Sequence, residues 1–221
     1  MLPPSRLNTT AEQETLFSSI AADLRAQGYA ITHNALPADI ACGLQERILT
    51  LQESGLRHAG TGRRQEHQVN GSIRRDKIRW LTREDDSEAA WLRYMDSMQQ
   101  YMNRHLFLGL FSYECHFSHY QSGDFYKKHL DAFRGQANRL LTTVLYLNPD
   151  WQPADGGELV IYQADAHDDE LLRVRPDAGT LVTFLSEEYP HEVLPARRDR
   201  YSIAGWFRLN SSTGGRADPP H

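Results

Sequence analysis

Residues 123–133 read GDFYKKHLDAF, and the pair His129 and Asp131 within this stretch decides how the rest of the chain is interpreted. The pair follows an aromatic segment, FYKK, that is typical of a strand. In an extended chain, side chains two positions apart project from the same face. An imidazole nitrogen and a carboxylate oxygen can therefore share a metal ion here, although a solvated pair on a polar turn has the same spacing.

An HxD pair alone is weak support for a metal site, because His167 and Asp169 form a second one in ADAHDDE. That pair lies in a very polar segment between strands, where we expect solvated side chains. The first pair has a further partner, since His191 lies 62 positions after His129. Four expected strands separate Asp131 from His191, which in a jelly roll is the length of chain that returns to a neighbouring position.

The second half of the chain reads as strands separated by turn residues, which indicates a β-sandwich or jelly roll. Turns fall at QSGD, NPDWQPADGG, ADAHDD and PDAG. The expected strands are FSYECHFSHY (111–120), RLLTTVLYLN (139–148), GELVIYQ (157–163), ELLRVRP (170–176), GTLVTFLS (179–186), PHEVLP (190–195) and RYSIAGWFRL (200–209).

The first half of the chain reads as three helices that would brace this core. The first helix can begin at Thr9 or Thr10 with a capping box and ends at Gly28, the second spans 37–53, and the third spans about 85–106. Apolar and methionine side chains at this spacing are typical of core. Those assigned to the core are Leu16, Phe17, Ile20, Ala21, Leu24, Ile40, Leu44, Ile48, Leu51, Trp91, Met95, Met98 and Met102.

Residues 57–72 are polar, glycine-rich and basic, and include Arg63 and Arg64. They read either as a solvated loop or as a mobile finger that closes over a substrate. Residues 73–80 alternate as an edge strand would. The expected organisation is N-terminal helices with the finger in 1–109, the jelly-roll core in 110–209, and a disordered tail in 210–221.

Composition limits the class of protein. The 221 residues favour one domain, and 40% hydrophobic with 24% charged residues suffices for a core. A net charge of −5 and a pI near 6.0 argue against a nucleic-acid partner. The chain has no bilayer-length apolar run and no secretory signal, and Cys42 and Cys115 match no disulfide or zinc pattern. We expect a cytoplasmic, reduced monomer without a membrane partner.

Two histidines and one carboxylate are the ligand set of non-haem Fe(II) oxygenases, which leave three metal positions open. Catalytic zinc, with three protein ligands and a water, is the competitor. A cosubstrate would distinguish them. If the strands at 190–194 and 199–208 pair as an antiparallel hairpin, His191 lies opposite Arg200 and both face the same side.

An inward arginine is costly to bury without an anionic partner. 2-Oxoglutarate supplies one, because its keto-acid end can chelate iron while its far carboxylate binds Arg200. Tyr146, expected to point inward with Thr142 and Val144, can donate a hydrogen bond to the same carboxylate.

The motifs YQSGDFYKKHLD, RLLTTVLYLN, GGEL, GTLVTF, YPHEVLP and RYSIAGWF together resemble the Fe(II)- and 2-oxoglutarate-dependent prolyl 4-hydroxylases. Within them the chain resembles the branch of the animal hypoxia-sensing enzymes and their bacterial counterparts. The resemblance covers roughly residues 57–209, and IRRDKIRWL matches the strand after the substrate-closing loop. It implies an α+β fold, a double-stranded β-helix (jelly roll) braced by N-terminal helices.

The resemblance implies hydroxylation at C4 of a prolyl residue in a protein, using Fe(II), 2-oxoglutarate and O2, supported by L-ascorbate, and releasing succinate and CO2. Bacterial members are associated with elongation factor Tu, which makes it the leading candidate substrate. The alternative is an oxygenase acting on a free amino acid or another small molecule. A nucleic-acid demethylase or a non-catalytic module that binds metal or sugar ranks lower.

The resemblance also implies roles for individual residues. It makes His129, Asp131 and His191 the iron ligands. It makes Arg200, Tyr146 and Tyr120 cosubstrate residues, and Tyr126, Arg139, Trp206, Arg63 and Arg64 substrate residues. The chain departs from the family at Ala204, where animal relatives carry a threonine, and the interval from Tyr120 to His129 is one residue shorter.

Overall fold

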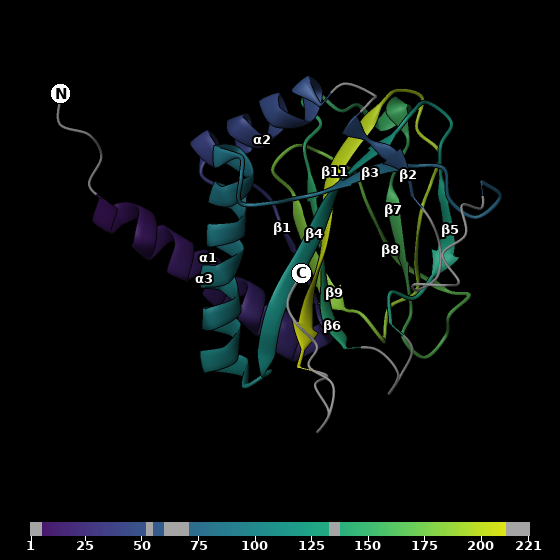
Figure 1. Ribbon diagram of the computed structural model, residues 1–221. Helices are drawn as coiled ribbons and strands as arrows, with labels where there is room; N and C mark the ends of the chain where they lie inside the picture. Colours follow the sequence, from purple (N-terminus) through teal and green to yellow (C-terminus); the bar gives the residue numbers. More distant parts are fainter. Residues whose placement is uncertain (1–5, 52–54, 60–70, 133–137, 211–221) are drawn as a thin grey trace, which may run out of the picture.

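The computed structural model describes residues 6–51, 55–59, 71–132 and 138–210 (Figure 1). Two antiparallel sheets face each other, and the helices lie on the other side of the larger sheet (Figure 1). This confirms the expected jelly roll braced by N-terminal helices. The elements are α1 (Arg6–Gln27), β1 (Tyr29–Thr32), α2 (Ala38–Thr50), β2 (Arg57–His58), β3 (Lys77–Trp80), α3 (Asp86–Leu106), β4 (Leu110–Tyr120), β5 (Tyr126–His129), β6 (Arg139–Tyr146), a 3₁₀ turn (Pro153–Asp155), β7 (Leu159–Tyr162), β8 (Glu170–Val174), β9 (Leu181–Leu185), β10 (His191–Val193) and β11 (Arg200–Leu209).

The chain moves repeatedly between the two sheets. The larger sheet has the strand order β1-β9-β6-β11-β4-β3-β2, and the smaller has β5-β10-β7-β8. From β4 to β11 the strands therefore fall in the larger, smaller, larger, smaller, smaller, larger, smaller and larger sheet. This alternation is the winding of a double-stranded β-helix, and it encloses a space between the sheets.

The expected hairpin of the strands at 190–194 and 199–208 is wrong. β10 pairs with β5 and β7, so His191 lies opposite His129 and Ile161. β11 pairs with β4 and β6, and Arg200 lies opposite Tyr120. In a jelly roll the chain crosses to the other sheet between such strands, so a short turn does not make them neighbours.

The helices cover the outer face of the larger sheet with an apolar core, and the assigned core residues are buried or partly buried there. α1 begins at Arg6, upstream of the expected capping box, so that expectation is wrong. α3 is capped by Asp85, whose Oδ1 accepts from the backbone N–H of Ser87 (3.0 Å) and Glu88 (3.1 Å). Among the described helices, none is long and apolar enough to cross a membrane.

The expected edge strand near 73–80 forms as β3, but it lies between β4 and the two-residue β2. Buried Glu88 fixes this strand, because its carboxylate accepts from Arg79 of β3, from Arg47 of α2 and from the backbone N–H of Thr82. The expected finger at 57–72 is described only at its ends, where Arg57–His58 form β2, while Arg63 and Arg64 lie outside the described ranges. The expected tail at 210–221 lies outside them from residue 211 onward.

The helix-to-sheet core predicts a stability difference between two truncations. Met98 of α3 is fully buried, so Met98→Ala should lower the free energy of unfolding by about 2–5 kcal/mol through lost burial and a cavity. Leu49→Ala, at a side chain that is 66% exposed, should change it by less than about 0.5 kcal/mol. Urea unfolding followed by circular dichroism measures both, and equal effects would contradict this packing.

Candidate active site

His129, Asp131 and His191 form a compact cluster between the sheets. His129 ends β5, and His191 begins β10 directly opposite it. Asp131 lies two residues after β5, with its oxygens 3.7 Å from His129 Nε2 and 3.5 Å from His191 Nε2. One ligand atom from each residue lies within 4.8 Å of the other two, so a single metal ion can bind all three.

Backbone carbonyls orient both imidazoles. His129 Nδ1 lies 2.8 Å from the Lys127 carbonyl oxygen, and His191 Nδ1 lies 3.0 Å from that of Tyr189. A carbonyl only accepts, so each Nδ1 carries the proton and each Nε2 presents its lone pair to the cluster. Metal-binding histidines use this arrangement, because the outer hydrogen bond fixes both tautomer and ring orientation.

The carboxylate is held and ionised. Thr142 Oγ1 donates to Asp131 Oδ2 (2.7 Å) and lies 2.9 Å from Ser186 Oγ. Burial acts to raise the pKa of Asp131, but electrostatic interactions with His191, His129 and Arg139 outweigh it and lower the pKa to about 2. Burial, with His191 nearby, lowers the pKa of His129 to about 3. The carboxylate is therefore anionic and His129 neutral at neutral pH, as a metal site requires.

A second set of polar groups lies on the inner face of the larger sheet. Arg200 is 1% exposed, and its guanidinium carbon lies 5.1 Å from the ring centre of Tyr120 and 5.0 Å from that of Tyr146. Its Nε donates to the Gly157 carbonyl (2.9 Å) and its Nη1 to Ser202 Oγ (3.4 Å). No carboxylate of the described residues forms an ion pair with it.

Tyr146 adds an unused donor beside this arginine. Its hydroxyl is buried and has no hydrogen-bond partner among the described residues. Burial raises the pKa of Tyr146 to about 12 against the lowering effect of Arg200, so the hydroxyl keeps its proton. Burying a cation without an anionic partner costs free energy, and so does burying a hydroxyl donor without an acceptor. An anion such as the far carboxylate of 2-oxoglutarate would relieve both costs.

Gly157 is a member of this group that the sequence analysis did not assign. It has φ +73°, and a Cβ there would lie 2.8 Å from Ala196 Cβ and 3.3 Å from Arg200 Cδ. Only glycine lets the backbone carbonyl approach the guanidinium this closely. The signal in the sequence was the Gly-Gly pair in ADGGELV.

Three of the five expected substrate residues lie on strands around the cluster, and the other two, Arg63 and Arg64, are outside the described residues. Tyr126 of β5 stacks on His129, with ring centres 3.6 Å apart. The ring centre of Trp206 of β11 lies 6.4 Å from that of Trp80 of β3, which is half-exposed. The Arg139 guanidinium lies 3.7 Å above the Trp206 ring.

A buried ion pair beside Tyr126 was also missed. Asp76 is fully buried and accepts from Arg74 Nε (2.7 Å) and Nη2 (2.6 Å). The Arg74 guanidinium lies 4.3 Å above the Tyr126 ring, and these two residues form an isolated antiparallel bridge. The segment before β3 is thereby attached to the smaller sheet. An isolated RxD in a basic stretch carries no periodic signal that would predict it.

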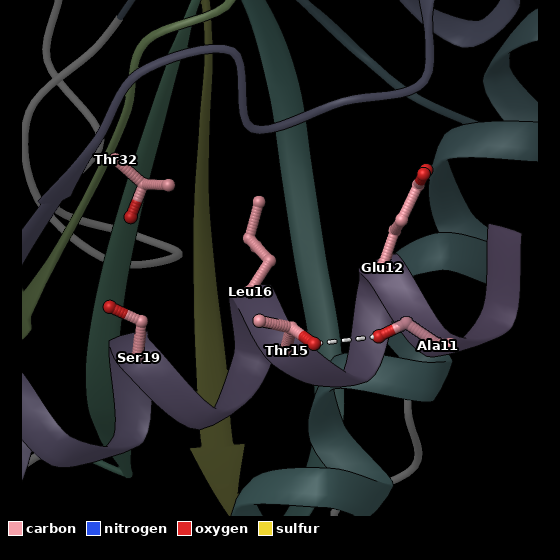
Figure 2. A pocket seen from close by; sticks show the side chains of 6 residues that line it. All are labelled: Ala11, Glu12, Thr15, Leu16, Ser19 and Thr32. Atoms are coloured by element: carbon pink, nitrogen blue, oxygen red, sulfur yellow. Dashed lines mark hydrogen bonds between the residues drawn. The ribbon is translucent and has the colours of Figure 1, made fainter. Parts of the chain in front are cut away.

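Two other features are separate from this site. The second HxD pair is exposed in a turn, as expected, and joins no metal-type cluster among the described residues. A hollow of about 460 Å³ runs along α1 and β1 (Figure 2). It shares no residue with the cluster, and its lining is Ala11, Glu12, Thr15, Leu16, Ser19 and Thr32.

Comparison with known proteins places the chain in a family. Residues 115–208 match the 2OG-Fe(II) oxygenase superfamily. A Pseudomonas putida prolyl-4-hydroxylase structure has 39% identity and a TM-score of 0.78, with 89% of this chain and all of that one covered. A Trichoplax adhaerens prolyl hydroxylase, solved with a hypoxia-inducible factor peptide, has 25% identity and a TM-score of 0.80, with 92% and 94% covered.

A curated relative, the hypoxia-inducible factor prolyl hydroxylase of Caenorhabditis elegans, is 30% identical over 193 residues, which are 81% of this chain. The match spans only 26% of that protein, and 44% of human Egl nine homolog 1. The chain belongs to the 2OG-Fe(II) oxygenase superfamily. The Pseudomonas putida, Trichoplax adhaerens and Caenorhabditis elegans proteins are named prolyl hydroxylases, which agrees with the resemblance in the sequence.

The cluster predicts that metal binding depends on one HxD pair and not on the other. His129→Ala should weaken Mn(II) binding by more than the roughly 10–100-fold that loss of an outer hydrogen-bond partner costs. His167→Ala changes a histidine in the same motif at an exposed turn and should leave binding unchanged. Isothermal titration calorimetry with metal-free protein measures both, and equal losses would contradict the assignment.

Proposed function

We propose that the protein hydroxylates C4 of a prolyl residue in a protein substrate, using Fe(II), 2-oxoglutarate and O2 and releasing succinate and CO2. The observation that carries the proposal is the buried Arg200, which has no anionic partner among the described residues and lies beside the unpartnered hydroxyl of Tyr146. Neither a catalytic zinc site nor a sugar-binding module requires a buried arginine and tyrosine beside the metal ligands. Membership in the superfamily supports iron in preference to zinc.

The metal ligands would be His129, Asp131 and His191. Bound Fe(II), 2-oxoglutarate and O2 supply the oxidation of a C–H bond. The protein's part is to keep both Nε2 lone pairs and the Asp131 carboxylate aimed at one point before the metal arrives. This preorganisation avoids the cost of ordering the ligands during binding.

Arg200 and Tyr146 would bind the far carboxylate of 2-oxoglutarate, with Tyr120 beside them. Two guanidinium hydrogen bonds are already used on Gly157 and Ser202, which fixes the plane of the group. The remaining donors of the guanidinium would bind the carboxylate in the space between the sheets, where low dielectric strengthens a charge-assisted hydrogen bond.

The substrate would meet an aromatic and basic wall. We assign Tyr126, Arg139 and Trp206 to it, with Arg63 and Arg64 of the finger closing from outside. Aromatic faces bind a prolyl ring by apolar contact, while guanidinium groups donate to peptide carbonyls. The relatives named prolyl hydroxylase support a protein substrate. Elongation factor Tu is our candidate.

Mass spectrometry of a bacterial lysate tests the proposal. The lysate is incubated with the protein, Fe(II), 2-oxoglutarate and ascorbate, which keeps the iron reduced. We expect one prolyl residue of one protein, with elongation factor Tu inspected first, to gain a single oxygen. His129→Ala should abolish the reaction, and His167→Ala should not. Succinate formation without a modified protein would instead favour a small-molecule substrate, and full activity of His129→Ala would refute the ligand assignment.

The cosubstrate assignment has its own test. Arg200→Ala should raise the 2-oxoglutarate concentration needed for half-maximal succinate formation by roughly 30-fold or more, because removing one partner of a buried charge pair costs about 2–5 kcal/mol. Arg198→Ala removes an exposed arginine two positions away and should leave the requirement unchanged. An unchanged requirement in folded Arg200→Ala would move the role to another residue.

A further inference from the structure

Glu114 and Arg139 form an ion pair across a strand. Glu114 is on β4 and Arg139 on β6, and β11 lies between these strands in the sheet. Arg139 Nε and Nη2 both donate to Glu114 Oε1, at 3.0 and 2.8 Å. Strands two apart in a sheet are separated by about 9.5 Å. Each side chain must therefore extend over β11 to reach the other.

The residue of β11 that lies beneath this bridge is Trp206. It is paired with Glu114 on one side and with Thr142 of β6 on the other, so all three side chains share the inner face. The guanidinium lies 3.7 Å above the indole ring, close enough for a cation–π contact. The N–H groups along one edge of the guanidinium bind the carboxylate of Glu114, and the flat face of the guanidinium lies over the indole ring of Trp206.

The orientation of the Trp206 indole depends mainly on packing. Trp206 is 7% exposed, and its Nε1–H is buried without a hydrogen-bond partner among the described residues. The indole donor lies near the Asp131 carboxylate and helps to lower its pKa, but it forms no hydrogen bond of normal geometry with the described residues that would fix the rotation of the ring. Packing against His116, with ring centres 5.4 Å apart, and the guanidinium above it do so instead.

The charge of Glu114 is what keeps the guanidinium in place. Arg208 of β11 also reaches Glu114, with Nη1 3.4 Å from Oε2, so one carboxylate lies between two cations. Without the carboxylate, two guanidinium groups would face each other beside a site that binds a divalent cation. Arg139, which is 25% exposed, would move toward water and uncover the ring.

We propose that Glu114 is a positioning residue for the substrate wall: it holds Arg139 flat over Trp206 and so fixes the indole against which the prolyl ring would bind. The substrate part rests on the proposed function. Glu114 contacts no ligand of the cluster, and its effect passes through Arg139 to Trp206.

The direct test reads the indole itself. The chain has four tryptophans, so the ¹⁵N–¹H spectrum contains at most four indole Nε1–H signals. The signal that disappears in Trp206→Phe is that of Trp206. Glu114→Gln keeps the shape and removes the charge. It should shift or broaden the Trp206 signal while the other indole signals stay in place.

The matched control is Glu170→Gln. Glu170 also accepts two hydrogen bonds from one arginine, Arg173, but both residues are on β8 and both side chains are exposed. It should leave the Trp206 signal unchanged. An unchanged Trp206 signal in Glu114→Gln would overturn the proposal. If that variant does not fold, Arg139→Lys tests the same contact, because an ammonium cannot pair along an edge while lying flat on a ring.

Turnover then separates this proposal from the proposed function. With limiting bacterial lysate as the substrate source, Glu114→Gln should lower prolyl hydroxylation by about tenfold, while succinate formation without lysate stays within about twofold of the unchanged protein. An equal fall in both would indicate general damage and overturn the positioning role. If the unchanged protein hydroxylates nothing, the proposed function fails, and the indole signal still decides whether Glu114 holds Trp206.

Discussion

The register of β10 between β5 and β7 is the constraint on which the site depends. It sets His191 directly opposite His129, so that both imidazoles reach the carboxylate of Asp131. Successive side chains of a strand point to opposite faces, and a slip of one residue would exchange His191 for Glu192. Glu192 now lies on the other face, where Tyr162 donates a hydrogen bond to it. The pairing of β10 with β5 is irregular between His191 and Val193, and Asp131 lies two residues after the end of the short β5.

The two faces of the larger sheet serve different purposes. Its outer face joins the helices in an apolar cluster that includes Phe117, Leu145 and Ile203. Its inner face, one residue out of phase along the same strands, carries Arg200, Tyr146 and Trp206. Strand alternation makes this possible, because a single strand can contribute to a core and to a polar site at once. The helices stabilise the sheet from the side where no polar group has to be satisfied.

The inner face is also where burial is least compensated. Arg200 has no carboxylate partner, and the donors of Tyr146 and Trp206 have no acceptor among the described residues. Other buried charges in the same fold are paired, as Asp76 is with Arg74 and Glu88 with Arg47 and Arg79. Trp91 Nε1 in the helix core also lacks a partner, so the contrast concerns charge: the buried cation without a carboxylate lies where a ligand would supply one, whereas these other buried charges are paired within the chain.

Local patterns in the sequence determined the elements and the chemistry of the cluster. Helical spacing predicted α1, α2 and α3, and turn residues marked the main strands, because both signals depend on neighbours along the chain. The HxD pair needed only the period of an extended chain, and the family resemblance supplied the remaining roles.

Only the tertiary structure decided which strands pair. A hairpin between β10 and β11 was a reasonable expectation from a short turn, yet the two strands lie in different sheets. The bridge from Glu114 to Arg139 over Trp206, and the approach of Gly157 to Arg200, were likewise out of reach of the sequence. Each joins residues far apart in the chain, and their meeting depends on the order of strands in a sheet, which no local pattern encodes.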